Sequence, residues 1–173
     1  KLLLADAAPA VLDIMHDHGY LPSLLGTVPN LHLSRRLIAI ESGVAPMPDA
    51  RIRLAALALS VREDAARVGE RLRMSSADIA FLGDLSSGAC VLAKIGSEEL
   101  ARQDLYRQGV DVFRGETLLA WARSADAAEN PVWRDRYRLP ERWSVPKFPV
   151  SGRDLMALGH AAGPDMGRLL ASL

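Results

Sequence analysis

The residues best suited to chemistry lie near the end of the chain, where glycines and cationic side chains accompany signals for two helices. Gly163-Pro164 begins a helix with proline in its first turn, where the missing N–H costs nothing. The free N–H groups of a helix start can bind a phosphate, and glycine adds no bulk in its way. The candidate phosphate contacts are Arg142, Lys147, Gly152, Arg153, Gly163 and Arg168. An ordinary helical hairpin with solvated charges is the alternative, since one glycine turn is a weak signal.

The same stretch carries the helical framework that would hold those contacts. Ser151 can cap a first helix, with Asp154 at the acid position of a capping box and Gly159 just past the helix end. Apolar residues then recur at helical spacing in the second helix. We expect Leu155 and Leu169 to be core residues. The structural residues of the hairpin are Ser151, Asp154, Leu155, Gly159, Pro164, Gly167 and Leu169.

The hairpin pattern resembles the C-terminal signature of the bacterial tRNA nucleotidyltransferase (CCA-adding enzyme) and poly(A) polymerase family. It is carried by Phe148-Pro-Val-Ser-Gly-Arg-Asp-Leu155, by Leu158-Gly159 and by Gly163-Pro-Asp-Met-Gly-Arg-Leu-Leu170. The resemblance runs along the whole chain. Residues 8–21 are similar to the segment that follows the family's catalytic domain, and residues 71–78 and 105–109 look like family landmarks.

The resemblance implies that this region holds tRNA or another RNA, chiefly at the tRNA elbow and acceptor side. It also implies that a preceding catalytic head domain, using Mg²⁺, transfers CMP and AMP from CTP and ATP to the RNA 3′ end; CCA addition and poly(A) synthesis both stay open for the whole enzyme. The sequence contains no Asp-x-Asp, so no catalytic residue and no metal ligand is assigned here. We expect the isolated chain to be inactive. A glycine-hairpin DNA-binding module and a helical protein-interaction domain remain as alternatives.

Composition places few constraints on the partner. Lys plus Arg and Asp plus Glu number 21 each, so any basic patch must be local. The single Cys90 excludes an internal disulfide. No apolar run is long enough for a membrane span, and the chain reads as part of a longer cytoplasmic protein.

Three further groups of residues have both a functional and a structural interpretation. Met15-His-Asp-His18 contains a His-Asp pair, but side chains two apart on a helix diverge, so we interpret it as a polar helix end. The tryptophans could stack on bases, yet core anchoring is the more frequent role. The arginine clusters are interpreted as solvated surface. These residues are Trp121, Trp133, Trp143, Arg35-Arg36, Arg51-x-Arg53 and Arg134-x-Arg136-x-Arg138.

Capping signals and 3.6-residue periodicity occur throughout, and sustained period-two alternation does not, so the sequence predicts an all-α fold. We divide the chain into a helical neck and body (1–138), a Pro-rich linker (139–149) and the tail hairpin (150–173). The expected body is elongated. Its expected helices cover residues 9–19, 31–42, 50–59, 61–72, 76–85, 98–109, 110–122 and 131–137, with a connector at 21–30.

Overall fold

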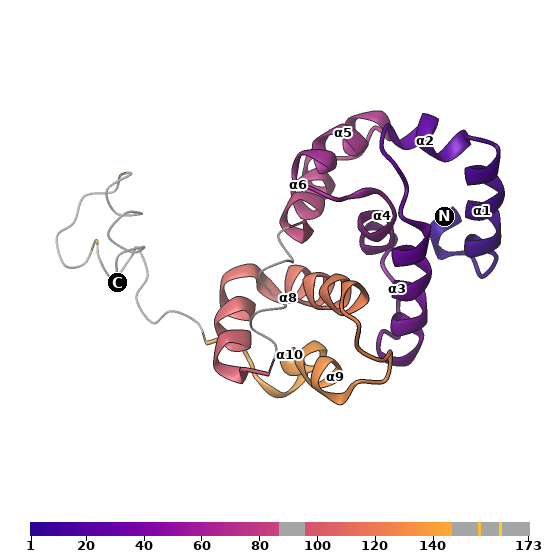
Figure 1. Ribbon diagram of the computed structural model, residues 1–173. Helices are drawn as coiled ribbons and strands as arrows, with labels where there is room; N and C mark the ends of the chain where they lie inside the picture. Colours follow the sequence, from indigo (N-terminus) through magenta and orange to yellow (C-terminus); the bar gives the residue numbers. More distant parts are fainter. Residues whose placement is uncertain (87–95, 147–155, 157–162, 164–173) are drawn as a thin grey trace.

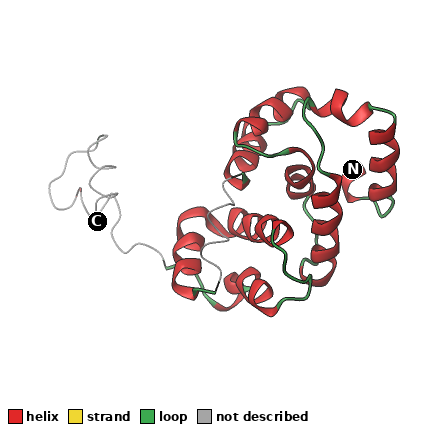
Figure 2. Ribbon diagram, viewed as in Figure 1, coloured by secondary structure: helices red, strands yellow, loops and turns green. Residues whose placement is uncertain are grey.

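The computed structural model describes residues 1–86, 96–146, 156 and 163 of the chain. Within these residues the fold is all-helical, as predicted, and no strand is present (Figures 1 and 2). None of the helices in the described part is both long and apolar enough to cross a membrane. The elements are η1 (Leu2–Leu4), α1 (Ala8–Asp17), α2 (Tyr20–Leu25), α3 (Leu31–Val44), α4 (Ala50–Ala58), α5 (Glu63–Arg71), α6 (Ser76–Leu85), α8 (Glu98–Arg123), α9 (Pro131–Tyr137) and α10 (Leu139–Arg142).

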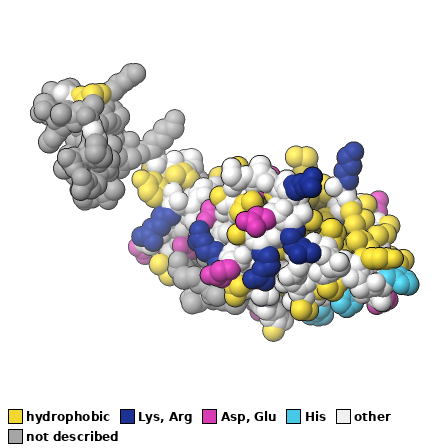
Figure 3. Space-filling view, turned by 90° about the horizontal axis from the view of Figure 1, so that it is seen from above, with side chains coloured by type: hydrophobic (Ala, Val, Ile, Leu, Met, Phe, Trp, Pro, Cys, Tyr) yellow, Lys and Arg dark blue, Asp and Glu magenta, His cyan; other side chains and the backbone are white. Residues whose placement is uncertain are grey.

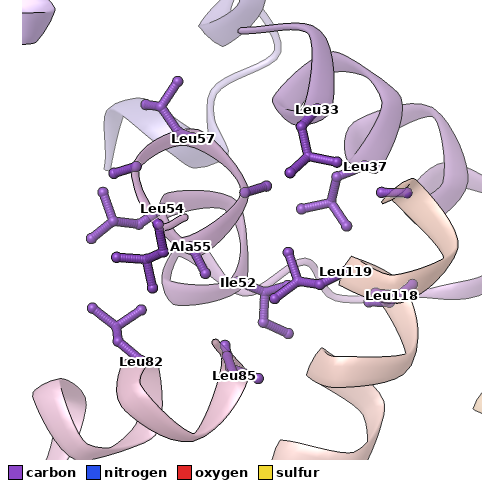
Figure 4. Close-up of a cluster of buried hydrophobic side chains, with 14 of the residues drawn as sticks. Leu33, Leu37, Ile52, Leu54, Ala55, Leu57, Leu82, Leu85, Leu118 and Leu119 are labelled. Carbon is purple, nitrogen blue, oxygen red and sulfur yellow. The ribbon is translucent and has the colours of Figure 1, made fainter. Parts of the chain in front are cut away.

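Helix α4 lies at the centre of the main core, where α3, α5, α6 and α8 all contact it. Its sequence is apolar around most of its circumference, which is typical of a helix buried on all sides. Six of its nine residues are buried, from Ile52 to Ala58. Leucines from three neighbouring helices surround it, as Figure 4 shows: Leu33 and Leu37 from α3, Leu82 and Leu85 from α6, and Leu118 and Leu119 from α8.

The predicted helix starts are confirmed at four side-chain caps. Asn30 Oδ1 accepts a hydrogen bond from the Leu33 N–H at 2.9 Å, and Ser75 Oγ accepts one from the Asp78 N–H at 3.1 Å. Ser97 and Asn130 cap α8 and α9 in the same way. Each cap satisfies an N–H group that has no partner inside its own helix, which explains why the local sequence located these boundaries.

Two predictions about local structure are wrong. Residues 20–25, expected in a connector, form α2, with Leu21 and Leu25 buried in the core. Ser60-Val-Arg-Glu63 has the sequence pattern of a capping box at the start of the helix expected over 61–72, but this box does not form. Instead Asp64 accepts hydrogen bonds from the N–H groups of Ser60 and Val61 at 2.9 and 3.0 Å, and Val61 is exposed. The first turn of α5 holds two acids, Glu63 and Asp64. Asp64 is the buried one, and its carboxylate caps the preceding loop.

Helix α8 is divided by Gly109, where the sequence predicted a break. Gly109 has φ 78° and ψ 171°, a backbone conformation that is essentially restricted to glycine, inside an otherwise helical segment. Leu105 before this kink and Phe113 after it meet Ala101 and Leu139 in a second, smaller core, with Trp143 packed against it. Residues 139–142, placed in the expected linker, therefore form α10 with a buried Leu139. The three-part division of the chain stays a prediction.

Candidate nucleic-acid interface

Most of the predicted phosphate contacts lie outside the described residues. Arg142 and Gly163 are described, and Gly163 is exposed with open space where a Cβ would stand. The predictions for the other contact and structural residues stay predictions. These residues are Lys147, Ser151, Gly152, Arg153, Asp154, Leu155, Gly159, Pro164, Gly167, Arg168 and Leu169.

Arg142 stands at the end of α10, beside the start of α8. Its Nη2 is 3.8 Å from Glu98 Oε2, and Glu98 Oε1 accepts a hydrogen bond from Arg102 Nη2 at 2.6 Å. All three side chains are about half exposed. One carboxylate thus faces two arginines, so the cluster keeps a net positive charge that a phosphate could use only in competition with Glu98.

An open pocket of about 240 Å³ adjoins this cluster and carries charges of both signs, from Glu98, Asp135, Arg136 and Arg142. Arg136 is not the solvated residue that the sequence suggested. Its side chain is 4% exposed, and its Nη2 donates to Asp104 Oδ2 at 2.9 Å. Its guanidinium lies 5.0 Å from the centre of the Phe113 ring. Arg136 therefore joins α9 to both halves of α8.

Arg53 is the second arginine for which the solvated-surface interpretation is wrong. Its Nε donates to Glu41 Oε2 at 2.7 Å, and its Nη1 donates to the Leu3 carbonyl at 2.7 Å. Burial raises the pKa of the Glu41 carboxyl, and the hydrogen bond and charge of Arg53 only partly offset this. This pair ties α3, α4 and the N-terminal turn together.

Arg51 and Arg35, from two further clusters, also pair with acids of the fold. Arg51 contacts Asp49 and Asp78, and its guanidinium lies 4.2 Å from the centre of the Phe81 ring. Arg35 is exposed and pairs with Asp13. On the face drawn in Figure 3, Lys and Arg side chains are spread out, with acidic side chains between them. That face shows no extended patch of one sign, in keeping with the balanced composition.

Two of the tryptophans are core residues, as predicted. Trp121 and Trp133 are almost completely buried and stack on each other, with ring centres 6.2 Å apart. Trp121 Nε1 donates to the Ala127 carbonyl at 3.0 Å, and Trp133 Nε1 donates to Asp126 Oδ2 at 2.6 Å. Neither ring can stack on a base without unfolding this contact. Trp143 is partly buried against the smaller core.

The described residues hold no group of three or more side chains that could bind a metal ion. His16 and His18 are exposed at the end of α1, where the sequence placed a polar helix end. The charged side chains discussed above are chiefly arginines, whose guanidinium groups can bind anions.

One arginine that the sequence interpretation missed is Arg123, at the C-terminal end of α8. Within the described part of the chain it makes no ion pair, and burial lowers the pKa of its guanidinium. It stands alone in the sequence, without a neighbouring cation, so no local pattern distinguishes it. Only the fold brings it beside Arg36, 87 positions earlier in the chain, at the edge of a shared pocket.

Comparison with known proteins indicates a distant relationship to CCA tRNA nucleotidyltransferases. No family model matches the chain. The mitochondrial CCA tRNA nucleotidyltransferase 1 of mouse (Mus musculus) is 24% identical over 176 residues, which takes in the whole chain but 39% of the mouse protein. The zebrafish (Danio rerio) protein of the same name is 53% identical over 32 residues, which is 18% of the chain and 7% of that protein. The chain thus spans about two fifths of the mouse relative.

Proposed function

We propose that this chain is the RNA-holding helical region of an enzyme related to tRNA nucleotidyltransferases. The observation that carries the proposal is the match to the mouse protein, which extends from one end of the chain to the other. The all-helical architecture agrees with what the family resemblance implies for this region. The substrate is then a tRNA whose 3′ end receives CMP and AMP.

The proposed division of labour follows from the chemistry of nucleotidyl transfer. The reaction needs closely placed carboxylates that hold divalent metal ions against the attacking and leaving oxygens. The sequence has no Asp-x-Asp, and its described residues form no cluster of metal ligands. We therefore assign Mg²⁺, ATP and CTP to a catalytic head domain of the whole enzyme, with which this region would cooperate, and assign RNA binding to this region.

The RNA contacts of this region are proposed to be phosphate contacts. Duplex RNA is recognised mainly by shape, through its backbone, and phosphate contacts position RNA without reading its sequence. Such recognition suits an enzyme that must accept many tRNAs. Many described arginines already hold carboxylates or carbonyl groups of the chain itself, so the proposal places contacts in the hairpin, at Arg153 and Arg168.

Replacing Arg153 and Arg168 together by Ala tests this proposal. We expect weaker tRNA binding and a slope of log affinity against log salt that is smaller by somewhat less than two units, because about two phosphate contacts are lost. Helicity and melting temperature should hardly change, since exposed charges contribute little to stability.

The matched control is the double variant Arg35→Ala and Arg62→Ala, which removes two exposed arginines of the described residues that lie outside the candidate sites. It changes the net charge by the same amount and should leave tRNA affinity nearly unchanged. Binding would be measured by fluorescence anisotropy across a salt series. If the hairpin variant, correctly folded, kept the affinity and the slope of the unmodified chain, the proposed contacts would be wrong.

A further inference from the structure

A second pocket lies where the start of α3, the end of α4 and the end of α8 meet. It is open, with a volume of about 510 Å³. Among the described residues that line it are two arginines and one histidine, and there is no carboxylate. The polar lining residues are Asn30, His32, Arg36, Ser60, Arg123 and Ser124. The pocket thus gathers cations and hydrogen-bond donors from three elements that are far apart in the sequence.

Arg123 is the first of its two cations, and its charge is not compensated by the fold. It is partly buried at the last residue of α8, and within the described chain no acid pairs with it. Burial lowers the pKa of its guanidinium, with no opposing contribution from a nearby carboxylate. An anion in the pocket would supply the missing partner.

Arg36 is the second cation, and its position is fixed by the chain. Its Nη2 donates to the backbone carbonyl of Asp126, which holds the guanidinium at the edge of the pocket. Its Nε is buried and has no hydrogen-bond partner among the described residues. Because Nε is closed to solvent, an anion in the pocket would have to contact the terminal NH₂ groups of Arg36, of which Nη2 already donates to the Asp126 carbonyl.

Two acids that adjoin lining residues, Asp126 and Asp64, make hydrogen bonds of their own. The Asp126 carboxylate accepts the indole N–H of Trp133 at 2.6 Å. Asp64 accepts the N–H groups of Ser60 and Val61 and lies 3.2 Å from Arg67 Nη1. Asp64 contacts the backbone N–H of Ser60, which lines the pocket, but neither carboxylate is itself part of the described lining, which therefore carries cations and no acid.

We propose that this pocket binds a phosphate group. A guanidinium is planar and presents paired N–H donors that match the oxygens of a phosphate. An anion bound between two guanidinium groups also reduces the repulsion between their charges. The source of the phosphate rests on the proposed function: a backbone phosphate of the bound RNA. A free phosphate or the phosphate of a nucleotide offers the same chemistry, and the experiment separates these sources.

The first arm uses inorganic phosphate and the whole chain. Amide chemical shifts in the ¹⁵N–¹H spectrum should move saturably at the pocket, including those of Asn30 and Ser124, and chloride at equal ionic strength should not reproduce this. Arg123→Met should abolish the response, and Arg138→Met, which removes an exposed arginine outside the pocket, should retain it.

A second variant keeps the test independent of any loss of stability. Ala125 is exposed and lines the pocket, so Ala125→Glu adds a carboxylate there without removing a native contact. It should also abolish the phosphate response, and the neutral Ala125→Gln should keep it. A response that is absent from the unmodified chain, or equal in the Glu and Gln variants, would overturn the proposal.

The second arm measures tRNA binding by the same four variants. If the phosphate comes from RNA, Arg123→Met and Ala125→Glu should weaken binding about tenfold at low salt, the loss of one charged contact. Arg123→Met should also reduce the salt slope by something under one unit. A phosphate response with unchanged tRNA binding would support the pocket and exclude RNA as its source. If even the unmodified chain bound no tRNA, the proposed function would fail, and the first arm would still decide the pocket.

Discussion

The side chains of Arg53 and Glu41 illustrate how arginine acts inside this protein. Glu41 is 2% exposed and Arg53 is 11% exposed, and they meet at 2.7 Å between α3 and α4. Removing one partner of a buried ion pair leaves the other charge in a medium that solvates it poorly. By contrast, Arg35 and Asp13 form an equivalent pair at the surface, with 52% and 39% of their side chains exposed.

We therefore expect Arg53→Met to lower the free energy of unfolding by about 3–5 kcal/mol, because Glu41 loses its partner. Arg35→Met, with the same change of charge, should cost about 1 kcal/mol or less. Urea unfolding of the two variants measures the difference directly. Equal costs would mean that the Arg53 pair contributes no more than a surface pair.

Asp64 makes the stability of the protein depend on pH. Burial raises the pKa of this carboxyl, but the N–H donors of Ser60 and Val61 and the charge of Arg67 outweigh burial, so its pKa lies below the ordinary value of 3.8. A depressed pKa means that the folded state favours the ionised form. Its contribution to stability is then complete above the ordinary pKa and is lost as the pH falls through the folded-state value.

The comparison of Asp64→Asn with the unmodified protein isolates this contribution. At neutral pH the amide should cost about 0.5–2 kcal/mol, the usual range for a lost cap. The difference in free energy of unfolding between the two proteins should shrink as the pH falls below about 4, where the Asp64 carboxyl begins to protonate, first in the unfolded chain. Urea unfolding at pH 7, 4 and 3 measures it, and a difference that stayed constant would contradict the assigned ionisation.

At the scale of elements, the kink at Gly109 allows α8 to contribute buried residues to both hydrophobic cores. The segment after the kink packs Leu118 and Leu119 against α4, and Phe113 joins Leu105 from the segment before it in the smaller core. In a straight helix, the segments before and after Gly109 would share one axis and could not be turned toward two different cores. The kink needs a positive φ that side chains other than glycine rarely adopt.

Gly109→Ala should therefore lower the free energy of unfolding by about 1–3 kcal/mol, the cost of holding a non-glycine residue in this conformation. The matched control is Gly43→Ala near the end of α3, where φ is not positive and, as at Gly109, nothing lies within 4 Å of the added Cβ. That variant should raise stability by about 0.4–1 kcal/mol. Thermal unfolding would compare them, and similar effects at both sites would argue against strain at Gly109.

Some of these elements could be predicted from the sequence, and others could not. Caps at Asn30, Ser75 and Ser97 were predictable because donor and acceptor lie within three residues of each other. The break at Gly109 was predictable because a glycine interrupts a helical pattern. Helix α2 was missed because Pro22 within it and Pro29 beyond it suggest a connector, and the burial of Leu21 and Leu25 overrides that local preference.

The arginines of the candidate site could not be assigned from sequence. Arg136 and its partner Asp104 are 32 positions apart, and Arg36 and the Asp126 carbonyl are 90 positions apart. Whether an arginine is buried, paired or available depends on which element faces it, and no short pattern records that. Sequence reasoning predicted a protein of balanced charge that acts by binding, and the fold shows which of its arginines contact acids or carbonyl groups of the chain itself.

At the scale of the whole molecule, the chain has a distant relationship to a tRNA nucleotidyltransferase over its full length and a helical body built around α4. Its charges balance overall, so RNA binding has to depend on local sites where arginines lack acidic partners. The hairpin arginines and the pocket at Arg36 and Arg123 are the two proposed sites. Affinity for RNA should accordingly be moderate, strongly dependent on salt and insensitive to sequence.

The most direct test of RNA holding is equilibrium binding of the purified chain to tRNA without its 3′ CCA end, compared with duplex DNA of similar length across a salt series. We predict saturable binding of several unrelated tRNAs with similar affinity, weaker binding of the DNA, and affinity that falls linearly with the logarithm of salt. Preference for the DNA would favour a DNA-binding module. Absence of tRNA binding at about 50 mM salt, where such contacts are strong, would contradict the account.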